Sequence, residues 1–286
     1  MLFYYNSSGL GNKMFRYAAA ASMFKHFKLT YMLSNIGSLK YFKLTRQDYI
    51  FNFFKVNYLV WIFLKLIRAK KIDFTSGWNY QNYADQLMNL NGNYMIRGCL
   101  AHPSFFFKDY ESVGKYFEVK KKYRQRFDSL SRELFNGCKI VVIHVRRGDY
   151  GTFQVEGLGD TDMTLPVSYY RKVVSIFDKN EIKYIFLSDD IVQVKKDFGY
   201  LENAFFSQEN EITDMLFLMN ADVCVLSCST FSWWGAVLNK KPGKVVYAPK
   251  YFLGFKVAKE YPEDIIPDDW IKVDVFGDDM PPVSSR

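Results

Sequence analysis

The chain has 286 residues, of which 49% are hydrophobic, 19% aromatic and 24% charged, a balance typical of globular proteins that excludes a mainly disordered chain. Its four cysteines and three histidines are too few and too scattered for a disulfide framework or a zinc site, so we expect a reducing, cytoplasmic setting. The net charge of +8 is confined to the first third, because residues 1–100 contain 13 Lys and Arg against 3 Asp and Glu, whereas the rest contains 25 against 27. This asymmetry suggests either an anionic partner for the first third, such as a membrane surface, a phosphorylated lipid or a nucleic acid, or a basic surface without a partner.

The N-terminal residues predict the first half of a βαβ unit. A short strand over Leu2–Tyr5 precedes the turn "NSSGLGN" and an alanine-rich helix from about Lys13 to Phe27. The sequence contains neither a complete G-x-G-x-x-G at this turn nor a G-x-x-x-x-G-K-[ST] pattern, so a dehydrogenase or a kinase is poorly supported. No basic segment followed by an apolar one opens the chain, and we therefore expect no secretory signal.

The middle of the chain, residues 40–135, has a mostly helical pattern. Its most apolar segment, Val56–Lys71, is interrupted by Lys65 and falls short of the ~20 apolar residues that a transmembrane helix needs. It predicts either a helix that faces the core or a basic, aromatic helix that lies on a membrane surface. An amphipathic helix over Lys120–Phe135 leads into the second half.

From Lys139 onward, apolar strands alternate with helices. The expected strands are "KIVVIHV", "KYIFLS", "NAFFS", "DVCVL" and "KVVYAP", and the expected helices lie near Pro166–Asp178, Val192–Phe198, Glu211–Met219 and Phe231–Leu238. Alternation of this kind predicts a parallel sheet with helices on both faces. We therefore expect an α/β fold with two Rossmann-like domains, residues 1–136 and 137–286, and a cleft between them.

Polar residues follow three of the expected strands. Arg146 and Arg147 follow the first, Asp189 and Asp190 follow the second, and "SCSTFS" follows "DVCVL" and opens a helix. The carboxyl ends of parallel strands meet at one edge of a sheet, where ligands bind. A guanidinium matches two phosphate oxygens, a helix N-terminus favours an anion, and carboxylates accept hydrogen bonds from a ribose or a base. Each feature alone would be an ordinary ion pair or helix cap, but together they predict a site for a nucleoside diphosphate.

Four motifs, in order between residues 9 and 236, resemble those of a known family. "GLGNKMFRYAAA" is similar to G-G-L-G-N-Q-M-F-Q-Y-A, "HVRRGDY" to H-x-R-R-G-D-Y, "FLSDD" to F-S-D-D, and "STFSWWGA" to S-T-F-S-W-W-G-A of the bacterial α-1,2-fucosyltransferases, glycosyltransferase family 11. The resemblance implies a GT-B fold and a metal-independent, inverting transfer of L-fucose from GDP-fucose to the 2-hydroxyl of a galactose in a cell-surface glycan or oligosaccharide. It makes residues 1–136 the acceptor-side domain and residues 137–286 the GDP-sugar-binding domain.

Carried over motif by motif, the resemblance implies roles for single residues. Arg146 is expected to hold the β-phosphate as the leaving group departs, with His144 beside it. Asp214 is expected to reach the guanosine. The full set of expected donor contacts besides Arg146 is Gly11, Asn12, His144, Arg147, Asp189, Asp190, Asp214, Ser229, Thr230 and Phe231. The chain departs from the family pattern where Lys13 and Arg16 replace glutamines and Cys228 replaces an asparagine.

The general base is harder to assign. Inverting transfer requires that a base remove the proton of the acceptor hydroxyl, and Asp149 is our candidate because it lies beside the arginine pair. Asp149 could equally cap the turn or hold Arg146 in position. Asp160 and Asp162 form a D-x-D pattern, by which metal-dependent transferases hold Mn²⁺ or Mg²⁺, but in a glycine-rich loop we expect no metal site there.

Three other interpretations remain open from the sequence. They are a transferase of the same fold that uses another nucleotide-activated deoxysugar, a non-catalytic carbohydrate-binding protein, and a nucleic-acid binder. We rank the last lowest, because the phosphate-type cluster lies in the half without net positive charge. As partners we expect GDP-fucose and a galactose-containing glycan, free or lipid-linked, and no nucleic acid. We expect the protein in the cytoplasm, in peripheral contact with the inner membrane if residues 50–71 lie on it.

Overall fold

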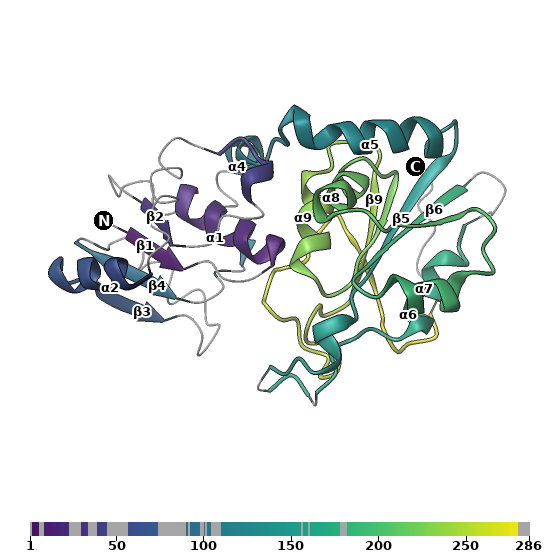
Figure 1. Ribbon diagram of the computed structural model, residues 1–286. Coiled ribbons are helices and arrows are strands. Elements are labelled where there is room, and N and C mark those ends of the chain that lie inside the picture. The colour runs from purple at the N-terminus through teal and green to yellow at the C-terminus, as the bar shows by residue number, and fades with distance from the viewer. Residues whose placement is uncertain are drawn as a thin grey trace. The chain divides into compact units, whose positions relative to one another are not determined.

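The protein consists of two compact units, Met1–Lys120 and Lys121–Arg286, in a computed structural model (Figure 1). We describe each unit by itself. The structure describes residues 2–5, 9–22, 30–33, 39–44, 57–73, 90, 92–97, 100, 102–103, 110–155, 157–159, 161–177 and 182–279.

The second unit begins earlier than the sequence suggested. We expected its domain to start at residue 137, but helix α5 (Lys121–Leu134) already belongs to it. Phe127 on α5 packs its ring edge-on against Phe217 of helix α8 (Glu211–Met219), with 5.5 Å between the ring centroids. The amphipathic pattern of α5 gave no indication of which unit its apolar face would cover.

The first unit contains a four-stranded parallel sheet in the order β2-β1-β4-β3. Its elements are β1 (Leu2–Tyr5), α1 (Leu10–Ser22), β2 (Thr30–Leu33), the 3-10 helix η1 (Leu39–Tyr41), α2 (Asn57–Leu66), β3 (Lys70–Asp73), β4 (Tyr94–Arg97) and α4 (Tyr110–Tyr116). The expected strand at the N-terminus is confirmed by β1. The expected helix is confirmed by α1, which begins at Leu10 instead of about Lys13, so the end of the expected turn is helical; residues 6–8 of that turn and residues 23–27 of the expected helix lie outside the described residues. The expectation of a mostly helical middle is wrong for β3 and β4, because strands of four residues are too short to show a periodic pattern.

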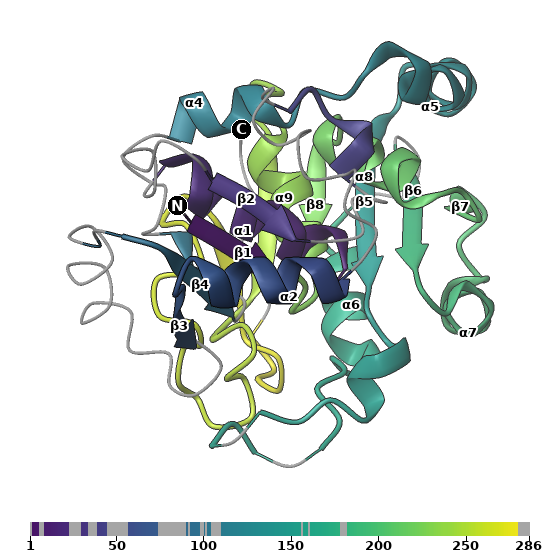
Figure 2. The same cartoon turned by 60° about the vertical axis from the view of Figure 1, so that its left-hand side comes forward.

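Helix α2 is the segment for which the sequence left two interpretations. Leu64 is 4% exposed, and the Phe63 ring lies 6.1 Å from that of Phe3 on β1, so α2 packs on the sheet of the first unit (Figure 2). The same helix leaves Ile62 39% and Leu66 75% exposed. Within the described ranges, no helix is both long enough and apolar enough to cross a membrane.

The second unit contains a six-stranded parallel sheet in the order β10-β9-β8-β5-β6-β7. Its elements after α5 are β5 (Lys139–Val145), the 3-10 helix η5 (Gly148–Gly151), α6 (Val167–Val174), β6 (Ile182–Ser188), α7 (Ile191–Phe198), β7 (Ala204–Phe206), α8, β8 (Val223–Val225), α9 (Thr230–Leu238), β9 (Val245–Pro249) and β10 (Ile271–Val273). The chain leaves β5 towards β6 on one side and returns to β8 on the other. This is the strand order of the Rossmann fold, and its topological switch point lies between β5 and β8.

Strand β5 is buried on both faces, as its continuous apolar sequence predicts. Val141, Ile143 and Val145 belong to a core that includes side chains of α6 and α7. His144 points to the opposite face, where its ring lies 5.4 Å from that of Phe231 on α9. Helices α6 and α7 thus cover one face of the sheet and α8 and α9 the other (Figure 1), which confirms the expectation of helices on both faces.

Candidate functional site at the switch point of the second sheet

The loops that follow β5 and β8 meet at the switch point and are held in place by two tyrosine hydroxyls. Tyr150, in the loop after β5, donates a hydrogen bond of 2.7 Å to the carbonyl of Cys228 in the loop after β8. Tyr169, on α6, donates one of 3.0 Å to the carbonyl of Leu226. The first bond joins the two loops and the second fixes the loop after β8 to α6. Both lie at the edge of the sheet where the sequence predicted that the arginines and the serine motif would meet.

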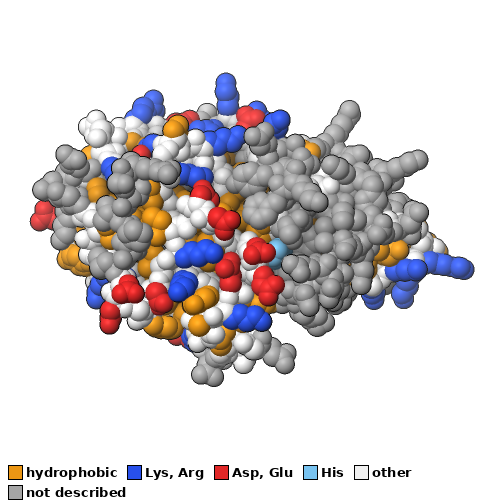
Figure 3. Space-filling model, turned by 180° about the vertical axis from the view of Figure 1, so that it is seen from behind, with side chains coloured by type: hydrophobic (Ala, Val, Ile, Leu, Met, Phe, Trp, Pro, Cys, Tyr) orange, Lys and Arg blue, Asp and Glu red, His pale blue; other side chains and the backbone are white. Residues whose placement is uncertain are grey.

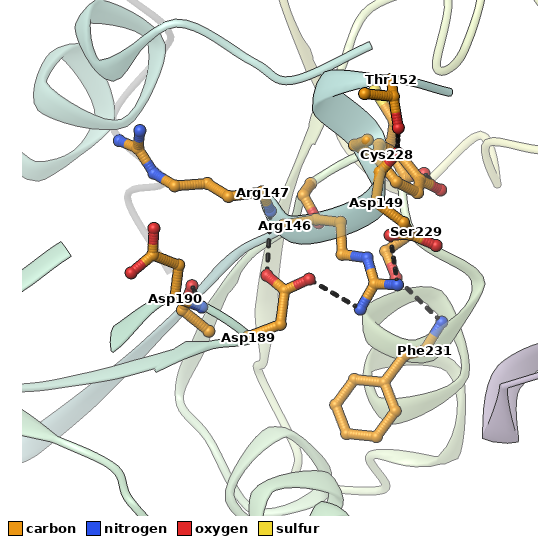
Figure 4. A network of polar contacts seen from close by, with 12 residues as sticks. Arg146, Arg147, Asp149, Thr152, Asp189, Asp190, Cys228, Ser229 and Phe231 are labelled. Atoms are coloured by element: carbon orange, nitrogen blue, oxygen red, sulfur yellow. Dashed lines mark hydrogen bonds and ion pairs between the residues drawn. The ribbon is translucent and has the colours of Figure 1, made fainter. Parts of the chain in front are cut away.

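Arg146 is held by two carboxylates that come from different elements (Figure 4). Its Nη1 lies 3.1 Å from Oδ2 of Asp189, and its Nη2 donates a 2.6 Å hydrogen bond to Oδ1 of Asp149. The guanidinium also lies over the Tyr150 ring, 5.4 Å from its centroid. Because the Arg146 side chain is still 31% exposed, the guanidinium is oriented and yet open to an anion from solvent.

Asp189 orders the loop as well as the arginine. Its Oδ1 accepts a 2.9 Å hydrogen bond from the backbone N–H of Arg147. A Cβ on Gly148 would lie 2.3 Å from Oδ2 of Asp189, closer than two such atoms can approach. The glycine of the "RRGD" sequence is therefore required for the carboxylate to reach Arg146.

Arg147 extends away from its neighbour (Figure 4). Its Nη2 donates a 2.6 Å hydrogen bond to Oδ2 of Asp197 on α7, and this ion pair is only 24% and 17% exposed. The structure thus does not bring the two adjacent arginine side chains together, although both were expected to contact the donor.

Asp189 and Asp190 are also neighbours in sequence whose side chains have different partners. It is the N-cap of α7, and its Oδ1 accepts a 3.2 Å hydrogen bond from the backbone N–H of Gln193. Such a cap stabilises the first turn of a helix by about 1 kcal/mol. Of the two expected contacts to a ribose or a base, one aspartate braces Arg146 and the other caps a helix.

His144 is buried beneath the serine loop. Its side chain is close to Ser227, with 2.7 Å between Nδ1 and Oγ, and the residue is 6% exposed. Burial, and then the positive charge of Arg146, lower the pKa of His144 to about 3. The imidazole is therefore neutral at pH 7 and can exchange a hydrogen bond with the serine, but it does not add positive charge to the site.

The serine loop leads into the N-terminus of α9. Ser229 is the N-cap, and its Oγ accepts a 3.3 Å hydrogen bond from the backbone N–H of Phe231. Thr230 and Phe231 are partly exposed at this end of the helix, which carries a partial positive charge. The rest of the motif is buried: Trp233 and Trp234 are 0% and 1% exposed. The motif thus combines a helix start whose partial positive charge favours an anion with side chains that pack in the core.

Asp214 lies on α8 and is largely buried. Ser207, directly after β7, donates a hydrogen bond of 2.5 Å from its Oγ to Oδ1 of Asp214. Burial raises the pKa of Asp214 to about 7, against the lowering effect of the Ser207 hydrogen bond and with a smaller contribution from the charge of Glu209. This carboxyl group changes its protonation state near neutral pH.

Four more residues that the sequence analysis considered belong to other elements or loops. Gly11 and Asn12 lie in the first turn of α1 in the first unit, Gly11 buried and Asn12 partly exposed. Asp162 accepts hydrogen bonds from the backbone N–H and the hydroxyl of Thr164, so it stabilises a turn, and Asp160 lies outside the described residues. Among the residues described, no cluster of His, Cys, Asp or Glu could hold a metal ion.

Sequence reasoning missed the residues that support the site. Tyr150 and Ser227 are parts of motifs that we had singled out, so their positions beside Arg146 and Ser229 were a usable signal. Asp197 and Tyr169 carried no such signal, because each acts on a residue that is distant in sequence.

A sequence model of the family described as "Glycosyl transferase family 11" matches residues 5–274, which confirms the resemblance drawn from the motifs. Among curated proteins, the chain is 30% identical over 142 residues to the O-antigen biosynthesis glycosyltransferase WbnK of Escherichia coli, covering 46% of this chain and 43% of that protein. It is 24% identical over 197 residues to an alpha-1,2-colitosyltransferase of Escherichia coli, covering 63% of this chain and 66% of that protein. The chain thus spans less than two thirds of the length of either relative.

Solved structures show the fold. The fucosyltransferase NodZ from Bradyrhizobium superposes with a TM-score of 0.52 at 13% identity, covering 82% of this chain and 92% of that one. NodZ alpha-1,6-fucosyltransferase soaked with GDP-fucose gives a TM-score of 0.50 at 13% identity, with the same coverage. A variant of Arabidopsis thaliana FUT1 in complex with GDP gives 0.50 at 12% identity, covering 86% and 69%. With the two parallel sheets, this likeness confirms the expected α/β fold of the GT-B type.

Proposed function

The chain belongs to glycosyl transferase family 11, and we propose that it transfers L-fucose from GDP-fucose to a hydroxyl group of a glycan. The observation that carries the proposal is Arg146, a partly exposed guanidinium held by two carboxylates at the switch point of a Rossmann-type sheet. Nucleotides bind at such switch points, and an oriented guanidinium binds phosphate oxygens in pairs. The likeness to a fucosyltransferase soaked with GDP-fucose adds support for the donor.

In this proposal the pyrophosphate of the donor lies between Arg146 and the start of α9. The guanidinium contacts the β-phosphate, and Ser229, Thr230 and Phe231 line the pyrophosphate at the helix N-terminus. The acceptor oxygen forms a bond to C1 of fucose while the bond from C1 to the β-phosphate oxygen breaks, and GDP leaves with that electron pair. Arg146 stabilises the negative charge that develops on GDP, so that no metal ion is required for this step.

Asp149 is the proposed general base of the reaction. Its carboxylate is 66% exposed and is bonded to Nη2 of Arg146. A donor phosphate would compete for this nitrogen, and binding of the donor would release the carboxylate to accept the proton of the acceptor hydroxyl. Inversion at C1 follows if this displacement takes place in one step.

Asp214 is the proposed contact to the guanine base. A guanine presents N–H donors, which an ionised carboxylate accepts. Because the pKa of Asp214 is about 7 in the protein without nucleotide, GDP should bind more weakly as the pH falls below that value. For Arg147 and Asp190 we propose a positioning role, since Asp197 and α7 already engage their side chains. Gly11 and Asn12 are proposed to approach the donor from the first unit.

As acceptor we propose the 2-hydroxyl of a galactose in a cell-surface glycan. We propose that the transfer takes place in the cytoplasm. A relative named as an alpha-1,2-colitosyltransferase supports the linkage, whereas the solved NodZ is named as an alpha-1,6 enzyme. The same relative favours a second candidate, transfer of a different nucleotide-activated deoxysugar such as colitose.

The test is an assay of the purified protein with GDP-fucose and lactose or N-acetyllactosamine, with and without EDTA. We expect GDP release, a fucosylated product in both conditions, and inhibition by added GDP but not by UDP or dTDP. Loss of product with EDTA would exclude the metal-independent mechanism. GDP binding without product would exclude this pair of donor and acceptor, and absence of GDP binding would exclude the proposed site.

A further inference from the structure

The surface formed by the end of α2 and the start of β3 combines two kinds of exposed side chain. We define the α2–β3 surface as residues 62–71. Ile62, Phe63 and Leu66 are 39%, 40% and 75% exposed. The cations of the surface are Lys65, Arg68, Lys70 and Lys71, and all four are exposed. Figure 3 shows Lys and Arg side chains gathered beside apolar ones on the first unit.

Two apolar residues of this surface, Ile62 and Leu66, are not the ones that hold α2 on the sheet of the first unit. Leu64 is 4% exposed and already anchors α2 on the sheet, with the edge of Phe63 against Phe3. Leu66, by contrast, exposes three quarters of its surface to water. Leu66 lies one helical turn from the exposed Ile62 and Phe63, and contiguous apolar side chains rimmed by polar ones mark a contact with another surface.

The turn between α2 and β3 is closed by hydrogen bonds and places a cation in a backbone conformation that glycine adopts more easily. Arg68 has a φ of 51°, in the left-handed region that favours glycine at the end of a helix. The turn is fixed by backbone hydrogen bonds from Arg68 to Lys65 and from Ala69 to Leu64, of 3.1 and 3.0 Å, and by a side-chain bond of 2.9 Å from Asn93 to the carbonyl of Ile67. The chain thus keeps a long cationic side chain at the tip of an ordered turn.

We propose that the α2–β3 surface docks the protein on an anionic lipid bilayer. Exposed apolar side chains of an interfacial helix insert at the boundary between headgroups and acyl chains, while neighbouring Lys and Arg contact the lipid phosphates. Leu66 and Ile62 are the apolar side chains that would insert, and the four cations are the groups that would contact the phosphates. The excess of positive charge in residues 1–100 gives the first unit the sign that such a membrane attracts.

Two simpler explanations account for only part of this surface. Lysines on an edge strand prevent sheets from pairing edge to edge. Since β3 lies at one edge of its sheet, this would explain Lys70 and Lys71. A nucleic acid would also attract the cations. Neither explanation gives a reason for the exposed Leu66 and Ile62 beside them.

The test is sedimentation with vesicles of phosphatidylcholine alone, or with about a third of phosphatidylglycerol to supply the negative surface potential. We expect binding to the anionic vesicles only, weakened by added salt. Changing Lys65, Arg68 and Lys70 to Gln should reduce the partition coefficient by at least about tenfold. The change Leu66→Ser should reduce it several-fold, because the side chain can no longer insert. As a matched control, changing Lys195, Lys196 and Lys240 to Gln removes the same charge from the second unit and should leave binding unchanged.

Three results would overturn the proposal. They are no binding of the wild-type protein to anionic vesicles, equal losses in the control and the α2–β3 variants, and a loss with the cation variant but not with Leu66→Ser. In the last case, binding of a labelled single-stranded oligonucleotide would assign the cations to nucleic acid instead. Melting temperatures within the range of the wild type show that each variant is folded, and the vesicle assay requires no transferase activity.

Discussion

The basic side chains at the switch point of the second unit and those on the α2–β3 surface of the first unit differ in their partners and in their exposure to solvent. At the switch point each arginine is bonded to a carboxylate, and Arg146 keeps only a third of its side chain exposed. On the α2–β3 surface the cations are exposed beside apolar side chains. A charge that is oriented and partly desolvated can act on one bound anion, whereas exposed charges act together on a surface and are screened by salt.

This contrast explains why overall charge was a poor guide to the site. The second unit has the oriented guanidinium although residues 101–286 contain 25 Lys and Arg against 27 Asp and Glu. The acidic residues there are partly the braces of the arginines, as Asp189 and Asp197 are. A region built to orient cations must contain anions as well, so its net charge is low.

The largest effect is expected at Arg146, and Arg147 is its matched comparison. The change Arg146→Ala should lower turnover about a hundredfold or more, by analogy with the loss of one oriented donor to a developing charge. The change Arg147→Ala should cost much less, because that guanidinium is bonded to Asp197. Steady-state rates with GDP-fucose measure both. Equal losses in two folded variants would show that the distinction between the arginines is wrong.

A stability measurement tests the buried carboxyl of the same unit. The pKa of Asp214 is raised from 3.8 to about 7, so the native state retains a proton that the unfolded chain has lost between these pH values. The free energy of unfolding should therefore fall as pH rises across that window, by up to about 1.4 kcal/mol per pH unit, and then level off. Urea unfolding of wild type and Asp214→Asn measures the difference, because the variant lacks this titration. Identical pH profiles would exclude the raised pKa.

A substitution of Gly148 tests whether activity depends on the contact between the Asp189 carboxylate and the Arg146 guanidinium. The change Gly148→Ala would place a Cβ 2.3 Å from Oδ2 of Asp189, and we expect a loss of roughly tenfold or more in kcat/KM, since small displacements of a reacting group are costly. Gly151, in the same 3-10 helix, is the control, because a Cβ there has no atom within 4 Å. Activity of Gly148→Ala at the level of Gly151→Ala would mean that the brace is dispensable.

The smallest effect is expected from a substitution of Asp149 on the affinity of the protein for GDP. The change Asp149→Asn removes the carboxylate that shares Nη2 of Arg146 with the proposed phosphate, and GDP should bind about threefold more tightly, as expected for one exposed ion pair. Calorimetric titration with GDP measures this. Weaker binding would mean that Asp149 positions Arg146 instead of competing for it. Turnover of the same variant tests the base, since an Asn cannot accept the proton.

The sequence by itself determined the second sheet and the region of its site. Strands such as β5 and β6 are long apolar runs because they are buried on both faces, so their positions can be read directly. The polar residues that follow them had to meet at one edge, because the strands are parallel. The family was recognisable for the same reason, since its motifs are short and contiguous.

Only the tertiary structure decided what neighbouring residues do. Arg146 and Arg147, like Asp189 and Asp190, are chemically alike in sequence, but successive side chains leave a strand end in different directions and meet different partners. The short strand β4 pairs with β1 and with β3, and α5 joins the second unit through a contact with α8. These outcomes depend on contacts between residues that are far apart in the chain, which local sequence patterns do not contain.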